Sequence, residues 1–552
     1  MKRMVLGCFA ATCLISAAFG AEETIVPPKA FVVPEGMEVS LWARSPMFFN
    51  PTNIDIDADG RIWVAEAVNY RGFRNRKKQE RWHEKGDRIM VLSDTTGDGR
   101  ADRSHVFVQD KDLVAPLGLA VIGNRVVVSC SPNLIVYTDV NKDGRFDPKT
   151  DRKEKLLTGF GGRDHDHSLH ALVAGPDGRW WFNTGNAGPH VVTDRSGWTL
   201  RATSPYDRRR SKLKNKEAGF QSDDGRIYVG GLAMSINPDG TGLEVHSHNF
   251  RNNFETALNS FGDVFQNDND DGVVTCRTTW LMRHANAGYA SADGHRTWQA
   301  DRRPDQSTAA AHWHQDDPGV VPYGDLYGAG SPTGMAVYEG DLFGEKYRGM
   351  LMSCEAGRNI VFGYHVKPKG AGLALERFSL MNSGTPDDRN YKWRKRFKDV
   401  RKWFRPSDVA VGPDGAIYVA DWFDPVVGGH QMDDRDGTGA IYRIAPAGSA
   451  GRKLPVPSID WQVLEGRIQA LRSPAPNVRA VGFEKLKSQK DAAVPALRKL
   501  LKDSNPFVAA RAVWLLAQLG PEGRSHVQSM LSADDPARRV VAARALHRGG
   551  VE

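Results

Sequence analysis

Cysteine is scarce in this chain. Its 552 residues contain five cysteines, of which Cys8 and Cys13 lie in an N-terminal segment that we expect to be removed. The other three, Cys130, Cys276 and Cys354, allow at most one disulfide and leave at least one free thiol. Because neither Cys-x-x-Cys nor Cys-x-x-Cys-His occurs, the chain cannot hold a covalent c-type haem.

Long apolar runs are missing after the N-terminus. Lys2 and Arg3 precede an apolar run over residues 4–19, and small residues surround position 20. This pattern predicts a secretory signal over residues 1–20, which would export the protein to the periplasm or the cell envelope. No later segment is long and apolar enough for a transmembrane span.

Neither sign of charge dominates the composition. The formal net charge of +8 becomes +6 when Lys2 and Arg3 are removed with the signal. Basic runs over residues 74–81, 208–216 and 392–405 fit either a surface for an acidic polysaccharide or, as charge runs more often do, solvated loops. We do not expect nucleic acid to be a partner of an exported protein.

What the chain does contain is a repeated strand–turn–strand unit. Each unit has an apolar β-type run, a tight turn built on glycine, and a second β-type run. Six units begin near residues 53, 117, 170, 255, 334 and 408. The recurrence predicts an all-β, six-bladed β-propeller over residues 21–446, with the loops before the first strands gathered around one axial pocket.

The pattern changes after a Gly- and Pro-rich linker at residues 447–457. Leucine and alanine then recur at helical spacing, and Pro476, Pro506 and Pro536 follow one another at a period of 30 residues. A proline at the start of each helix is typical of HEAT-like repeats, an all-α superhelix that forms a binding or spacing surface. We therefore predict such a domain over residues 458–552.

One loop has oxygen-bearing side chains at the spacing of a calcium-binding loop. Asp139, Asn141, Asp143 and Asp147 occupy loop positions one, three, five and nine, with Gly144 at position six. This spacing predicts a calcium site. The alternative is a hairpin whose Asp-Gly turn needs no metal.

Histidines gather directly before the third unit, at His165, His167 and His170. They fit a transition-metal site, or a single histidine acting as general base at the pocket, because imidazole titrates near neutral pH. A structural role is the alternative.

Charged and amide side chains occur at the corresponding places of other units. Arginine and asparagine at the mouth of a pocket suit a carboxylate or carbonyl ligand, and carboxylates suit a hard cation such as calcium. Solvated loops are again the alternative. The residues selected in this way are Arg251, Asn252, Arg358, Arg405, Asp270 and Asp271.

The third and fourth units resemble the soluble quinoprotein glucose/sorbosone dehydrogenases, which bind pyrroloquinoline quinone (PQQ) over calcium. His167 stands eight residues before Gly175, as the catalytic histidine of that family does, and Arg251 and Asn252 match the start of its fourth-blade motif. The resemblance implies that His167 is the base, that the selected arginines and Asn252 hold PQQ, and that Asp270 and Asp271 support calcium.

Two positions depart from the pattern of that family. Asn186 stands where the family has the aspartate that orients the base, and Phe254 stands where it has a glutamine. Asp166 or Asp164 is the candidate to replace the orienting carboxylate.

The arrangement as a whole is similar to a bacterial family of membrane-bound dehydrogenases, in which a signal peptide, a propeller and HEAT repeats follow one another. Residues 254–262, 311–318 and 403–415 carry this likeness. Longer members end in a Cys-x-x-Cys-His haem domain. The resemblance implies that this chain passes electrons to a separate cytochrome c.

Two hypotheses follow. In the first, an exported PQQ-dependent enzyme oxidises a sugar, a polyol or a related alcohol or aldehyde, with a cytochrome c docked on the HEAT-like repeats. In the second, the chain is a non-catalytic module that binds a glycan or a partner protein.

Overall fold

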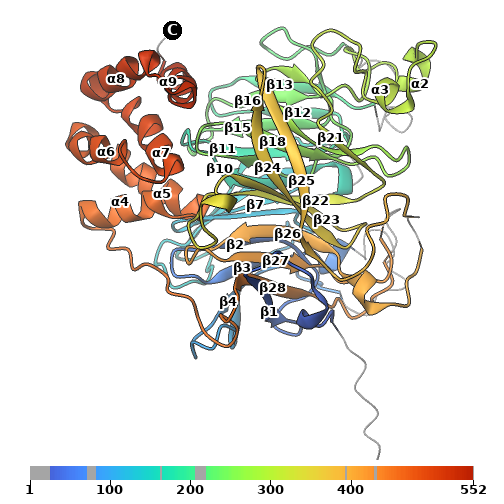
Figure 1. Cartoon of the computed structure of the whole chain (residues 1–552), viewed down its shortest axis with the longest axis horizontal. Coiled ribbons are helices and arrows are strands. Elements are labelled where there is room, and N and C mark those ends of the chain that lie inside the picture. The colour runs from blue at the N-terminus through green and yellow to red at the C-terminus, as the bar shows by residue number, and fades with distance from the viewer. Residues whose placement is uncertain are drawn as a thin grey trace, which may run out of the picture.

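The computed structural model describes residues 25–70, 82–161, 165–205, 219–391, 395–427 and 432–550 (Figure 1). The predicted signal at residues 1–20 lies outside this part of the chain. A mostly β N-terminal region is followed by a helical C-terminal region, as the sequence predicted. Within the described residues, no helix combines the length and the apolar character that a membrane crossing requires.

In the part of the chain that the structure describes, six sheets of four or five strands follow one another. The first five are β2 (Pro51–Ile56), β3 (Ile62–Glu66), β4 (Arg88–Ser93) and β5 (Arg103–Gln109); β6 (Gly118–Ile122), β7 (Arg125–Cys130), β8 (Asn133–Thr138) and β9 (Arg152–Thr158); β10 (Leu169–Ala174), β11 (Trp180–Thr184), β15 (Leu232–Ile236), β16 (Glu244–His248) and β20 (Ala285–Asn286); β17 (Thr256–Leu258), β18 (Val264–Asp268), β19 (Cys276–Leu281) and β21 (Asp325–Gly328); and β22 (Pro332–Tyr338), β23 (Met350–Glu355), β24 (Ile360–Lys369) and β25 (Gly372–Asn382).

The last of the six sheets joins the two ends of the β region. In it, the N-terminal strand β1 (Met37–Arg44) pairs antiparallel with β28 (Ala440–Pro446). The sheet continues through β27 (Ile417–Asp421) to β26 (Pro406–Val411). A small additional sheet contains β12 (His190–Thr193), β13 (Thr199–Thr203) and β14 (Tyr228–Val229).

The first strands of successive sheets contact one another. β2 contacts β6, β6 contacts β10, β10 contacts β17, β17 contacts β22, β22 contacts β26, and β26 contacts β2. Apolar side chains fill the space between neighbouring sheets; one cluster, for example, joins Val127 and Val136 of the second sheet to Trp180 and Met234 of the third.

Buried carboxylates connect these first strands. Asp408 Oδ2 accepts a hydrogen bond from the backbone N–H of Ile54 (2.7 Å), and Glu255 Oε2 accepts one from Met335 (2.7 Å). Asp55 Oδ2 accepts one from the backbone of β6 at 2.6 Å, and burial raises the pKa of Asp55 to about 7. Polar side chains inside the β region thus satisfy backbone groups that face a neighbouring sheet.

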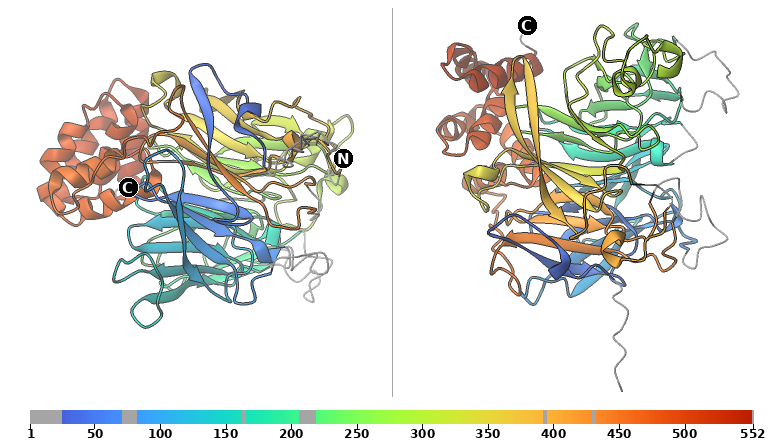
Figure 2. Two further views of the ribbon diagram at one scale, coloured as in Figure 1. Left: turned by 90° about the horizontal axis from the view of Figure 1, so that it is seen from below. Right: turned by 45° about the vertical axis from the view of Figure 1, so that its right-hand side comes forward.

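The C-terminal helices begin where the proline period predicted. Pro476, Pro506 and Pro536 are the first residues of α5, α7 and α9. The helices lie beside the sheets in both views of Figure 2 and share one apolar core. Their bounds are α4 (Leu464–Arg472), α5 (Pro476–Lys487), α6 (Val494–Leu500), α7 (Pro506–Leu516), α8 (Gly520–Ser529) and α9 (Pro536–Arg548).

These helices pack against the turns between the first and second strands of the sheets. Gly178 and Gly262 have positive φ, and an added Cβ would lie 2.7 Å from Phe483 and 2.7 Å from Trp514, respectively. Glycine is thus required at these turns both by the backbone conformation and by the close approach of an aromatic ring.

The three described cysteines are all buried and form no disulfide. Burial raises the pKa of the Cys130 thiol to about 12, and it raises the pKa values of Cys276 and Cys354 as well. The one disulfide that the sequence allowed is not formed.

Candidate functional site

The loops before β10 and β17 lie next to each other. A short 3₁₀ helix over His165–His167 leads into β10, and Arg251 and Asn252 precede β17. The backbone N–H of Asn186 donates to the carbonyl of Arg251 at 3.0 Å, and that of Ala187 donates to the carbonyl of His167 at 2.8 Å. The two stretches that resemble the quinoproteins are therefore brought together.

His167 is buried, with 6% of its surface exposed, and its Nδ1 lies 2.8 Å from the side-chain oxygen of Asn186. The backbone of Asn186 is held by the hydroxyl of Ser204, which donates to the main-chain carbonyl at 2.6 Å, while the side-chain oxygen faces the His167 ring. In this amide orientation the oxygen accepts from Nδ1–H, so the proton-free nitrogen of the neutral ring is Nε2. The ring is thereby oriented as a general base requires.

Asp166, the other predicted catalytic residue, contacts a different side chain. Its Oδ2 accepts a hydrogen bond from the hydroxyl of Tyr70 at 2.7 Å. His170 lies between two backbone carbonyls, with Nδ1 2.6 Å from Asn253 O and Nε2 3.0 Å from Asp166 O. The side-chain oxygen of Asn186 is within hydrogen-bond distance of the His167 ring. The side chain of His165, and Asp164, lie outside the described residues.

Arg251 makes several internal contacts. Its Nε lies 3.2 Å from Asp270 Oδ2, and its Nη1 donates to the backbone and side-chain oxygens of Asn269 at 2.8 and 2.7 Å. The backbone N–H of Asn252 donates to Asp268, while the buried Asn252 Oδ1 has no hydrogen-bond partner among the described residues.

The other two predicted ligand-binding arginines hold loops together. Arg405 is 1% exposed and donates to the carbonyls of Asp424 and Ala356, both at 2.9 Å; burial lowers its pKa to about 10. Arg358 is 3% exposed and pairs with Asp387. Nη2 of Arg358 also contacts Asp387, whereas Nη2 of Arg405 is buried without a hydrogen-bond partner in the described structure.

The predicted calcium ligands are engaged in turn-forming hydrogen bonds. Asp139 Oδ2 accepts from the N–H of Gly144 (2.9 Å), and Asn141 Oδ1 accepts from that of Asp143 (3.1 Å). Asp147 Oδ1 accepts from Lys149 at 2.9 Å. Among the described residues, no three His, Cys, Asp or Glu side chains converge as they do around a metal ion.

Carboxylates at the ends of second strands were missed by sequence reasoning. Glu66, Asp268, Glu355 and Asp421 each accept a backbone N–H from the loop that leads into the first strand of the same sheet. Burial raises the pKa of Glu355 and of Asp421 to about 7. The signal was an acidic residue at the end of the second strand in four of the six units.

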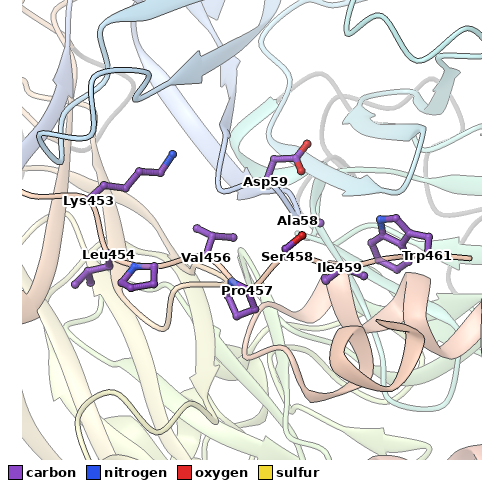
Figure 3. Close-up of a pocket in the computed structure, with 10 residues that line it drawn as sticks. Ala58, Asp59, Lys453, Leu454, Val456, Pro457, Ser458, Ile459 and Trp461 are labelled. Atoms are coloured by element: carbon purple, nitrogen blue, oxygen red, sulfur yellow. The ribbon is translucent and has the colours of Figure 1, made fainter. Parts of the chain in front are cut away.

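A groove of about 500 Å³ lies at the opposite ends of the strands (Figure 3). Asp59 of the β2–β3 turn and the extended segment 453–461, which includes Trp461, line it. A second groove of about 630 Å³ lies between Phe483 of α5 and the turns at Gly178 and Asn237. The first groove thus lies between a turn of the first sheet and the segment that leads to the helices, and the second lies between the third sheet and the helices.

The fold and the site define a mostly β repeat protein with a polar cluster at one end of its sheets and HEAT-type helices at the other. The chain belongs to a family described as "Domain of unknown function (DUF7133)", whose sequence model matches residues 27–448. A second model, described as HEAT repeats, matches residues 464–547. No curated protein sequence matches the chain.

Solved structures similar to this chain include PQQ-dependent sugar dehydrogenases. The PQQ-bound aldose sugar dehydrogenase of Streptomyces coelicolor is 12% identical over 75% of this chain and 99% of its own, with a TM-score of 0.45. The PQQ domain of pyranose dehydrogenase from Coprinopsis cinerea is 14% identical over 75% and 97%, with a TM-score of 0.46. A family AA12 carbohydrate-active enzyme of Trichoderma reesei, in a calcium structure, is 14% identical over 78% and 100%, with a TM-score of 0.47.

Proposed function

We propose that this protein is an exported oxidoreductase that oxidises the hydroxyl-bearing carbon of a sugar, a polyol or a related alcohol or aldehyde. The observation that carries the proposal is the contact between His167 Nδ1 and the side-chain oxygen of Asn186. A buried imidazole held in one orientation, beside a second polar loop, suits the removal of a proton from a substrate hydroxyl.

In this mechanism Nε2 of His167 takes the proton of the substrate hydroxyl, while a hydride leaves the carbon that bears this hydroxyl. Asn186 keeps the ring in place, and its neutral amide leaves the imidazolium without a countercharge at that position. A bound quinone such as PQQ would supply the acceptor for the hydride. Electrons would then pass to a separate cytochrome c, because this chain lacks the Cys-x-x-Cys-His sequence.

The residues present fit a polar organic ligand better than they fit calcium. Asn186 Nδ2, Asn252 Oδ1 and Arg405 Nη2 are buried without a hydrogen-bond partner among the described residues, which suits a ligand rich in oxygens. Asp270, in contrast, already contacts two basic side chains. We therefore assign no step to calcium.

The finer features of the fold belong to the same proposal. The contacts that run from β2 through five other first strands and back to β2 support a six-bladed propeller over residues 21–446, with a linker at 447–457 and HEAT-like repeats over 458–552. The helix ends that pack on the sheets are buried there and cannot bind a partner. A cytochrome would therefore dock on the outward helices α4, α6 and α8.

The test is reconstitution of the purified protein with PQQ, followed by dye reduction across a panel of sugars and polyols. Cofactor binding is monitored separately, by absorbance. We expect turnover with the wild-type chain, and we expect His167→Ala to lose turnover but still bind the quinone. His526→Ala in α8 is the matched control and should behave as the wild type. Absence of both binding and turnover would reject the proposal.

A second candidate function is a binding module without catalysis. It is favoured because Arg251, Arg358 and Arg405, the predicted cofactor-binding arginines, already contact protein groups. Glycan-array binding with unchanged strength in His167→Ala, and without dye reduction, would support this candidate instead.

A further inference from the structure

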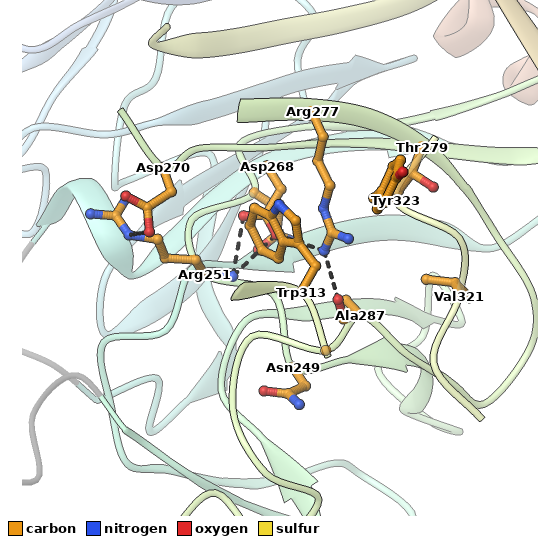
Figure 4. A network of polar contacts seen from close by, with 12 residues as sticks. Asn249, Arg251, Asp268, Asp270, Arg277, Thr279, Ala287, Trp313, Val321 and Tyr323 are labelled. Atoms are coloured by element: carbon orange, nitrogen blue, oxygen red, sulfur yellow. Dashed lines mark hydrogen bonds and ion pairs between the residues drawn. The ribbon is translucent and has the colours of Figure 1, made fainter. Parts of the chain in front are cut away.

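Residues 285–324 form an insertion between β19 and β21 that contains β20, α2 (Trp298–Asp301) and α3 (Thr308–His312). Buried contacts fix it to the fourth sheet (Figure 4). The Arg277 guanidinium lies 3.7 Å from the centre of the Trp313 ring, and its Nη2 donates to Asp268 (3.1 Å) and to the carbonyl of Ala287 (2.8 Å). Both Arg277 and Trp313 are fully buried, so these contacts anchor the insertion to β19.

The residue before Trp313 reaches the predicted metal ligands. His312 is 1% exposed, and its Nε2 lies 3.0 Å from Asp270 Oδ2. The same oxygen lies 3.2 Å from Nε of Arg251, and the other oxygen of Asp270 accepts the N–H of Val273 at 3.2 Å. Protein groups therefore surround the Asp270 carboxylate.

This arrangement is the opposite of an empty calcium site. A calcium ion takes six to eight oxygen ligands, and carboxylates gathered for it repel one another when it is absent. The Asp270 carboxylate lies instead against two basic side chains, 3.2 Å from Arg251 Nε and 3.0 Å from His312 Nε2. The carboxylate is stabilised as an anion by the side chains themselves.

We propose that Asp270 is clamped between Arg251 and His312, that it is not a calcium ligand, and that His312 is a positioning residue for Arg251. The insertion thus sets the direction of the arginine at the mouth of the site. The proposal concerns the arrangement of these side chains and holds whether or not the chain oxidises a substrate.

A clamped Asp270 and an empty calcium site predict opposite changes in melting temperature for one substitution. Asp270→Asn removes the charge and keeps the shape. Measured in EGTA, it should lower the melting temperature by at least about 2 °C, because Arg251 Nε and His312 Nε2 lose the carboxylate charge that they contact. In an empty calcium site the same change would relieve repulsion and raise the melting temperature. Asp271→Asn, in the adjacent position, is the matched control and should change the melting temperature less than Asp270→Asn.

Calcium dependence gives a second, independent readout. Any rise in melting temperature on adding millimolar calcium should be equal in the wild type and in Asp270→Asn, because binding elsewhere is unaffected. His312→Gln should lower the melting temperature in EGTA by less than His312→Ala, since the amide keeps a polar group beside Asp270. Loss of a calcium-induced rise in Asp270→Asn, or stabilisation of that variant in EGTA, would overturn the proposal.

Discussion

The strongest energetic prediction concerns Glu339, which connects the sheets to the helices. Glu339 lies in the turn after β22 and is fully buried. Its Oε2 lies 2.7 Å from Arg511 Nη2 of α7 and 2.9 Å from Arg479 Nη1 of α5, and it also accepts the hydroxyl of Ser260 at 2.6 Å. The two arginine charges outweigh burial and keep the pKa of Glu339 below its ordinary value.

We predict that Glu339→Gln destabilises the protein by about 3–5 kcal/mol, the cost of leaving buried charges without their partner. Both Arg479 and Arg511 are buried, so neither guanidinium can recover its hydration without separating the helices from the sheets. The helical region should therefore unfold first.

Urea unfolding followed by circular dichroism at a helix-sensitive wavelength measures this loss. Glu376→Gln is the matched control, because Glu376 forms an ion pair with Lys367 in which both side chains are more than half exposed. Such a pair contributes at most about 1 kcal/mol. If Glu339→Gln shifts the transition no more than Glu376→Gln does, the packing of the helices on the sheets does not depend on this buried charge cluster.

Three further predictions follow from buried groups. Burial raises the pKa of Asp55 to about 7, so between about pH 4 and pH 7 the folded state holds a proton that the unfolded state releases. Stability should therefore fall as pH rises through this window, and Asp55→Asn should reduce the slope of unfolding free energy against pH; an unchanged slope would contradict this. Native protein should show no thiol reactive towards a disulfide reagent, and the denatured mature chain should show three, because all three cysteines are buried. Reaction of any thiol in the native state would refute their burial. Asn186→Ala should lower dye reduction by up to about 100-fold, because the His167 ring is misplaced. Asn186→Asp should retain activity, because its side chain still accepts from Nδ1–H. Equal loss in both variants would show that the hydrogen bond is not the cause.

Much of the fold could be predicted because its signals are local. Alternating apolar runs with Gly-containing turns specify strands, and the 30-residue period of Pro476, Pro506 and Pro536 specifies the inner helices. The structure confirms a mostly β region followed by HEAT-like helices. The insertion over residues 285–324 was not recognised, because its short helices lack a periodic apolar pattern.

The site was predicted less completely. Placing His167 and Arg251 in loops before neighbouring first strands required only the repeat, and the structure brings these loops together. Which partner each side chain takes could not be predicted: Arg405 is buried against two carbonyls, and Asp166 contacts Tyr70. Sequence spacing gives the loop in which a residue lies but not the direction of its side chain.

The sequence by itself determined the order of the elements, the position of the turns and the change from sheets to helices, because these depend on residues close along the chain. Only the tertiary structure decided that Asp270 meets Arg251 and His312, and that Glu339 meets Arg479 and Arg511. The physical reason is burial. A charged group removed from water takes whichever opposite charge the packing of distant segments brings to it.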